Sequence, residues 1–101
     1  MAILAILSGE GINQKMYDTL REEVGWEYSY PPGAIFHAAS FDADGNAHVA
    51  DLWNSPQDFD EFVNTRLMPA MQKLNYPPPQ VDVYPVHNVN AFASIQPHIL
   101  S

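Results

Sequence analysis

Four residues near the middle of the chain carry side chains suited to acid–base chemistry or ligand binding: His37, His48, Asp51 and Trp53. His37 lies inside the apolar segment 34–41, where an imidazole must form a hydrogen bond to offset its desolvation. Such an imidazole can act as a general acid or base beside a pocket. The alternative is a core or interface histidine whose hydrogen bonds are satisfied, as they are for most buried polar groups. His37 is the first candidate catalytic residue.

His48 lies across a predicted hairpin from His37. If residues 42–45 form the loop, Ala39 pairs with His48, and His37 becomes its diagonal neighbour on the same face, about 7–8 Å away. Both imidazoles can then contact one ligand. Two histidines without a third ligand at a recognisable spacing make a weak metal motif. We therefore expect His48 to contribute to ligand binding, and we expect no metal site.

Asp51 and Trp53 share the sheet face opposite His37 in this pairing. Asp51, in a buried sheet, is a second candidate catalytic residue, or else pairs with a basic residue such as Arg66. A third interpretation places it at the rim of a dimer. Trp53 is expected to be a packing anchor whose indole N–H finds a partner, and it is a candidate ligand contact.

Tyr28, His87 and Asn88 complete the candidate ligand-binding residues. Tyr28 belongs to the aromatic stretch 26–30, which forms either a lid over a ligand or a cover for the core. His87 and Asn88 end the last predicted strand, where they either line a pocket mouth or cap the sheet. The sequence has no glycine-rich phosphate loop and no flavin or nicotinamide fingerprint, so we expect no cofactor.

Four predicted strands position these residues. The apolar run 2–8 ends in a glycine-containing turn and predicts a strand covered on both faces. Segments 34–41 and 46–53 flank Asp44-Gly45, which is a strong hairpin signal. The last strand covers residues 81–89.

Two helices are predicted between the strands. The first begins after the N-cap residue Asn13, with Ile12 and Tyr17 placed to form a hydrophobic staple, and ends at Gly25. The second begins after Ser55, which precedes a proline at the first helical position. Its apolar positions recur at helical spacing, and Pro69 should kink it.

The resulting order, β-α-β-β-α-β, predicts an α+β fold of the ferredoxin-like type, with a four-stranded antiparallel sheet and two helices on one face. Residues 1–89 form this domain and residues 90–101 a C-terminal tail. In segments 2–8 and 34–41, the odd-numbered and the even-numbered positions are both mostly apolar. Because these two sets point to opposite faces of the sheet, both faces should be packed against other parts of the protein. We expect a second copy to cover the open face, giving a homodimer. The alternative is a monomer whose tail folds across the open face.

The charge narrows the choice of partners. Twelve acidic residues against four basic ones give a formal net charge of −8, which disfavours nucleic acid and anionic membranes as partners. The chain has no cysteine, which excludes disulfides and thiolate chemistry. The apolar start has no basic leader and is too short to cross a bilayer. A cytoplasmic protein is expected.

The chain resembles the dimeric α+β barrel superfamily, and in particular its antibiotic-biosynthesis-monooxygenase-like members. Within that group it is most similar to small uncharacterised bacterial proteins. Besides the order of elements, the resemblance is carried by four short segments: Ile35-Phe36-His37, Asp51-Leu52-Trp53-Asn54-Ser55, Leu67-Met68-Pro69 and Pro85-Val86-His87-Asn88. It implies a cofactor-independent, monooxygenase-like enzyme acting on a small apolar or aromatic molecule. The superfamily also contains proteins without known activity, so the alternative is a non-catalytic dimer that binds a small ligand or serves as an interaction module.

Overall fold

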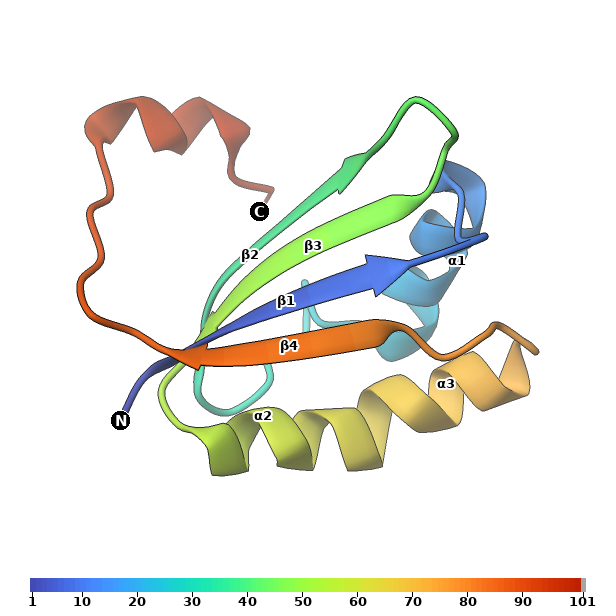
Figure 1. Cartoon of the computed structure of the whole chain (residues 1–101), viewed down its shortest axis with the longest axis horizontal. Coiled ribbons are helices and arrows are strands. Elements are labelled where there is room, and N and C mark those ends of the chain that lie inside the picture. The colour runs from blue at the N-terminus through green and yellow to red at the C-terminus, as the bar shows by residue number, and fades with distance from the viewer. Residues whose placement is uncertain (101) are drawn as a thin grey trace.

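The computed structural model of the chain describes residues 1–100 and has the predicted order of elements (Figure 1). The strands and helices are β1 (Ile3–Gly9), α1 (Gln14–Val24), β2 (Ala34–Phe41), β3 (Ala47–Trp53), α2 (Pro56–Phe62), η1 (Val63–Leu67), α3 (Met68–Lys73), β4 (Gln80–Pro85) and η2 (Ala93–His98). The sheet order is β2-β3-β1-β4, and every neighbouring pair is antiparallel. The predicted ferredoxin-like α+β fold is confirmed.

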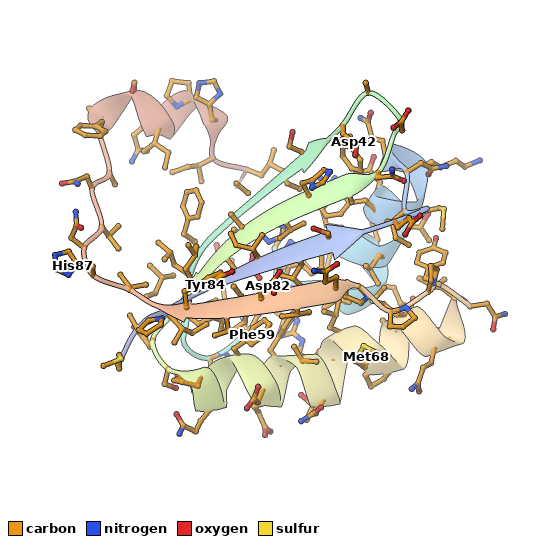
Figure 2. The ribbon with its side chains drawn as sticks, viewed as in Figure 1. Asp42, Phe59, Met68, Asp82, Tyr84 and His87 are labelled. Atoms are coloured by element: carbon orange, nitrogen blue, oxygen red, sulfur yellow. The ribbon has the colours of Figure 1, made fainter. Side chains whose placement is uncertain are left out.

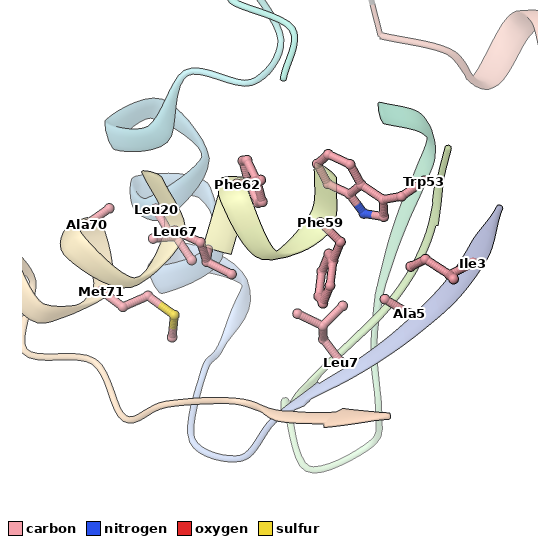
Figure 3. Packing of buried hydrophobic residues seen from close by; sticks show 10 residues of the cluster. All are labelled: Ile3, Ala5, Leu7, Leu20, Trp53, Phe59, Phe62, Leu67, Ala70 and Met71. Atoms are coloured by element: carbon pink, nitrogen blue, oxygen red, sulfur yellow. The ribbon is translucent and has the colours of Figure 1, made fainter. Parts of the chain in front are cut away.

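The helices cover one face of the sheet. Along β1, alternate residues Ile3, Ala5 and Leu7 are buried, whereas Leu4 and Ile6 on the other face are half-buried. The buried set joins side chains from all three α-helices in one core, and Figure 3 shows its aromatic part around Trp53. Among residues 1–100 the core that the helices form lies against this one face, so helices cover β1 on one side only.

Local capping fixes both helix starts. The Asn13 side chain accepts a hydrogen bond from the backbone N–H of Met16, and Ser55 does the same for Asp58. α1 stops at Gly25, which adopts a left-handed conformation (φ 74°) that favours glycine. These ends lie where the sequence predicted them.

Pro69 interrupts the second helix by widening it. A proline removes one backbone donor and crowds the carbonyl four residues before it, here that of Thr65. The chain responds with the π-helical turn η1, in which the N–H of Met68 bonds the carbonyl of Val63. α2, η1 and α3 therefore follow one another as a single irregular helix along the sheet (Figure 1).

The predicted hairpin register was wrong by one residue. Asp42 and Asn46 pair through their backbone, so the loop has three residues ending in Gly45 (φ 82°) rather than four. His48 consequently pairs with Ser40, and His37 pairs with Asp51. A shift of one residue moves each side chain to the other face. His37 and Asp51 therefore share the helix-covered face, and His48 lies on the open face.

The C-terminal segment leaves the body of the domain after β4, which ends at Pro85 rather than at residue 89 (Figure 1). η2 has no buried residue, and Phe92 and Leu100 are exposed. Tyr84 on the open face also stays exposed, so the described part of the tail, residues 90–100, does not cover that face as the monomer alternative required. Ser101 lies outside the described residues.

Candidate functional site

A pocket opens between the helix-covered side of β2 and β3 and the helices. It has a volume of about 450 Å³ and is mostly apolar. Its wall is rich in aromatic side chains and has polar groups in one region. The lining includes Leu7, Tyr17, Trp26, Glu27, Tyr30, Pro31, Ile35, His37, Asp51, Trp53, Phe62 and Leu67. Such a pocket suits a small apolar molecule with few polar groups.

A chain of hydrogen bonds crosses the polar part of this wall. Asp51 Oδ1 lies 2.6 Å from His37 Nδ1, and His37 Nε2 lies 2.7 Å from the hydroxyl oxygen of Tyr17. The second carboxylate oxygen, Asp51 Oδ2, accepts a hydrogen bond of 3.3 Å from the indole N–H of Trp53. The three residues Asp51, His37 and Tyr17 are hereafter called the relay.

The register and one helix bring the relay together. His37 and Asp51 are direct cross-strand partners on β2 and β3, and direct partners stand side by side on one face. Tyr17 reaches them from the first turn of α1, where Asn13 caps the helix and fixes its start. The two strand residues differ in burial: the side chain of Asp51 on β3 is 7% exposed, and that of His37 on β2 is 31% exposed. His37 was expected to be buried, and this was wrong: the residue is exposed, as is most of β2, although it lines the pocket.

The hydrogen bonds define the protonation of the relay. A carboxylate only accepts, so the proton between Asp51 and His37 lies on Nδ1. In the neutral imidazole Nε2 is then an acceptor, and it takes a hydrogen bond from the hydroxyl of Tyr17. Burial raises the pKa of the Tyr17 hydroxyl well above its ordinary value, which keeps the phenol protonated as the donor.

Two aromatic rings pack against His37. The Trp26 ring centre lies 5.1 Å from that of His37 in a tilted arrangement. The rings of Tyr17 and His37 are nearly parallel, 3° apart, with centres separated by 6.1 Å. The hydrogen bond between the phenol oxygen and the ring nitrogen links these two parallel rings, and both line the pocket.

Two other predicted contacts, that of His48 with a ligand of His37 and that of Arg66 with Asp51, are not formed at the pocket. His48 pairs with Asp42 at the exposed end of the hairpin, with 2.8 Å between Nε2 and Oδ2 (Asp42 in Figure 2). It therefore cannot share a ligand with His37. Arg66 donates hydrogen bonds to the carbonyls of Val24 and Ser29, so the suggested pair with Asp51 is not formed.

The remaining candidate ligand contacts divide between pocket and surface. Trp53 lines the pocket and is buried, as expected of a packing anchor with a bonded indole. Tyr28 is 76% exposed and does not line the pocket. His87 and Asn88 are exposed in the segment that leaves the sheet after β4; Figure 2 shows His87 pointing away from it.

Sequence reasoning did not nominate several residues that line the pocket, among them Tyr17, Trp26 and Glu27, and also Ile99 and Leu100 of the C-terminal segment. Tyr17 was assigned to a hydrophobic staple, and it does share a small buried cluster with Ile12. Trp26 was grouped with the aromatic stretch, and Glu27 was not considered. The one available signal was that Tyr17 is a polar aromatic residue on the apolar side of its helix, where a buried hydroxyl needs a partner.

The arrangement has the groups that a proton transfer requires. A buried carboxylate fixes the imidazole tautomer, and the imidazole nitrogen that faces Tyr17 can receive a proton. Within residues 1–100, no group of three or more histidine, aspartate or glutamate side chains is arranged to hold a metal ion. Over the same residues, no helix has the length and apolar character needed to cross a membrane.

Comparisons with known proteins identify the fold. No family model and no curated protein matches the chain. Among solved structures, it is similar to SnoaB, a cofactor-independent oxygenase from Streptomyces nogalater, with a TM-score of 0.60 and 10% identity over 87% of this chain and 93% of that one. A proposed antibiotic biosynthesis monooxygenase from Chloroflexus aurantiacus matches with a TM-score of 0.60 and 14% identity, covering 89% and 98% of the two chains.

A conserved protein from Methanosarcina mazei has a TM-score of 0.63 and 12% identity, covering 83% of this chain and 91% of that one. The chain therefore has the ferredoxin-like α+β fold of antibiotic-biosynthesis-monooxygenase-like proteins, as the sequence resemblance implied. At these identities the likeness concerns the fold alone.

Proposed function

We propose that this protein is a small-molecule enzyme that moves a proton from an apolar or aromatic substrate bound in the pocket, with the relay as its acid–base machinery. The observation that carries the proposal is the unbroken hydrogen-bond chain from Asp51 through His37 to Tyr17, which lines an aromatic cavity. Buried carboxylates that hold an imidazole in one tautomer increase its usefulness as a base.

The relay defines how the proton moves. A substrate O–H or acidic C–H approaches the oxygen of Tyr17, which gives its own proton to His37 Nε2 as it takes the proton of the substrate. Asp51, bonded to Nδ1, stabilises the imidazolium that forms. Trp53 holds the other carboxylate oxygen and keeps Asp51 in place. The return of the proton by the same route restores the resting state.

In its finer form, the proposal is a monooxygenase-like reaction without an organic cofactor. A deprotonated, electron-rich substrate can itself reduce dioxygen: a CH₂ group becomes C=O, and the second oxygen atom leaves as water. The same fold in a protein named as a cofactor-independent oxygenase supports this form. The pocket supports it through its aromatic wall, which suits a conjugated substrate.

A non-catalytic ligand-binding protein is the second candidate. One observation favours it: both nitrogens of His37 already have partners, as in a purely structural hydrogen-bond network. A ligand would then occupy the pocket without undergoing proton transfer.

We also propose that the protein works as a homodimer formed through the open face of the sheet. Two rows of laterally paired residues cross this face. The first contains Phe36, Leu52, Leu4 and Tyr84, and the second contains Ala38, Ala50, Ile6 and Asp82. Only Asp82 is charged in these eight positions, which is unusual for a chain of net charge −8. A third row, Ser40, His48, Ser8 and Gln80, is polar, so the apolar part of the face is the half formed by the first two rows. An apolar area of this kind is typical of an interface. Sedimentation at low micromolar concentration should give twice the chain mass; a monomer mass would refute the dimer.

The enzyme proposal is tested without knowledge of the natural substrate by following proton exchange. The probe is 2-tetralone, a fused-ring ketone with an acidic CH₂ group, incubated with the protein in D₂O and monitored by proton NMR. His37→Gln is the test variant, because glutamine can still donate to Asp51 but is not a base. Dioxygen uptake is recorded in parallel. The matched control is His48→Gln, which alters an exposed histidine on the other face.

Each outcome has a distinct meaning. Deuterium incorporation that is lost in His37→Gln and kept in His48→Gln supports proton transfer by the relay. Accompanying dioxygen uptake supports the monooxygenase-like form. Binding of 2-tetralone without any accelerated exchange would refute the enzyme and favour the ligand-binding protein.

A further inference from the structure

We propose that the pocket selects substrates whose polar end is uncharged or cationic and rejects anions, and that Glu27 is the residue that sets this selectivity. The inference rests on the proposed function and refines it to a class of substrate. It follows from the distribution of charge around the pocket, to which Asp51 of the relay and Glu27 outside the relay both contribute.

The charged residues of the pocket wall all have the same sign. Glu27 and Asp51 line the pocket, and no lysine or arginine does. A carboxylate, sulfate or phosphate group on a ligand would therefore enter the pocket without a cationic partner. Burial of an unpaired charge is costly, and here the two like charges add to that cost.

Three of the four basic residues lie away from the pocket, and the fourth, Arg21, is paired with Glu27 of the pocket wall and is not itself part of the lining. Arg66 binds two backbone carbonyls, and Lys73 pairs with Glu23 at 2.5 Å. Lys15 is exposed, in a shallow depression on α1 that is separate from the pocket. Arg21 is the nearest cation to the relay, and it lies between Asp18 (3.7 Å) and Glu27 (3.4 Å).

Glu27 is well placed to act on a ligand's polar end. It follows Trp26, whose ring packs on both His37 and Tyr17. Its side chain is 30% exposed, so part of its charge is shielded from water. Its charge is felt at the hydroxyl of Tyr17: burial is the main cause that raises the Tyr17 pKa, Arg21 opposes it, and Glu27 and Asp51 add to it.

The aromatic wall strengthens the preference. The faces of Trp26 and Tyr17 attract a cation and do not attract an anion. An alcohol, a phenol or an amine can donate a hydrogen bond to the oxygen of Tyr17 or to Glu27, whereas a carboxylate has no proton to donate. A hydroxyl or ammonium head group therefore fits this end of the pocket.

Three probes with one ring system and different head groups test the inference. They are 2-naphthol (neutral), 2-(aminomethyl)naphthalene (cationic) and 2-naphthoate (anionic), titrated calorimetrically at neutral pH. Trp26 and Trp53 are the only tryptophans in the chain and both line the pocket, so their two indole N–H signals in NMR show whether binding occurs there. We expect 2-naphthoate to bind at least about tenfold more weakly than 2-naphthol, and the amine to bind at least as well as the naphthol.

Glu27→Gln should reduce the gap between naphthol and naphthoate at least about threefold, because one of the two carboxylates is gone. The matched control, Glu22→Gln, makes the same change at an exposed position on α1 outside the pocket and should leave the gap unchanged. Equal binding of naphthoate and naphthol, or a gap that Glu27→Gln does not alter, would overturn this inference while leaving the proposed function intact. If none of the probes binds, the proposed function is refuted, and this inference is refuted with it.

Discussion

Replacing Asp51 with asparagine should destabilise the protein, because this carboxylate satisfies two donors at once. Residue 51 is only 5% exposed. Its Oδ1 accepts from His37 and its Oδ2 from the indole of Trp53. Asparagine is almost the same size but has one oxygen and one NH₂ group. In either orientation of the amide, one of the two donors faces another donor.

The magnitude follows from these two bonds. A buried donor left without an acceptor costs roughly 1–3 kcal/mol. The bond that survives becomes neutral, and the difference between a charged and a neutral hydrogen bond is about 1 kcal/mol. We therefore expect Asp51→Asn to lower the free energy of unfolding by about 2–4 kcal/mol. His37 can reduce this cost by moving its proton to Nε2, which would reverse the direction of the bond with Tyr17.

Urea denaturation followed by fluorescence measures the loss. Asp42→Asn is the matched control, because Asp42 also pairs with a histidine but lies in the exposed hairpin. Exposed pairs of this kind contribute little, so its effect should be clearly smaller. If Asp51→Asn is no more destabilising than Asp42→Asn, the carboxylate of Asp51 does not have the two bonded partners described here.

Three further predictions concern parts of the fold outside the pocket: a helix cap, the hairpin loop and the C-terminal segment. Ser55→Ala should lower the free energy of unfolding by about 1 kcal/mol, because the N–H of Asp58 loses its cap; an unchanged urea midpoint would show that Ser55 does not cap. The hydrogen bond from His48, with two backbone N–H bonds, lowers the pKa of Asp42 from 3.8 to about 2. The ionised Asp42 carboxylate therefore contributes its full stabilisation above pH 3.8, and this stabilisation is lost as the pH falls toward 2. NMR of the carboxyl group should give a titration midpoint of about 2 for Asp42; a midpoint near 3.8 would refute the pair with His48. Deleting residues 90–101 should leave the helical circular dichroism and the urea midpoint of the domain almost unchanged, since the described tail buries no side chain, and a large loss of stability would contradict the proposed boundary.

The predictable parts of the structure were those set by local chemistry. The N-caps Asn13 and Ser55 and the stop at Gly25 each depend on a few adjacent residues, and each was predicted from the sequence. The order of elements followed from them, and with it the fold. Pro69 was expected to kink its helix, and the structure instead has a π-helical turn just before it. The end of the last strand was less accurate, because nothing local marks Pro85 as the final paired residue.

The site was harder to predict because it depends on long-range pairing. His37 and Asp51 were both nominated, but a loop one residue shorter than expected placed them on the same face instead of opposite faces. Tyr17 lies in a helical pattern in which an aromatic residue reads as packing, and only the tertiary structure shows its hydroxyl against His37. The position of Trp26 likewise depends on a loop that has no regular period.

The proton-exchange rate of 2-tetralone in D₂O tests the central claim most directly. If the relay is acid–base machinery, the wild-type protein should accelerate exchange, and His37→Gln should reduce the acceleration roughly 10²–10⁴-fold, the usual contribution of a general base. Tyr17→Phe should also reduce it, because that variant removes the hydroxyl that passes the proton to Nε2. Exchange that is as fast in His37→Gln as in the wild type would contradict the account.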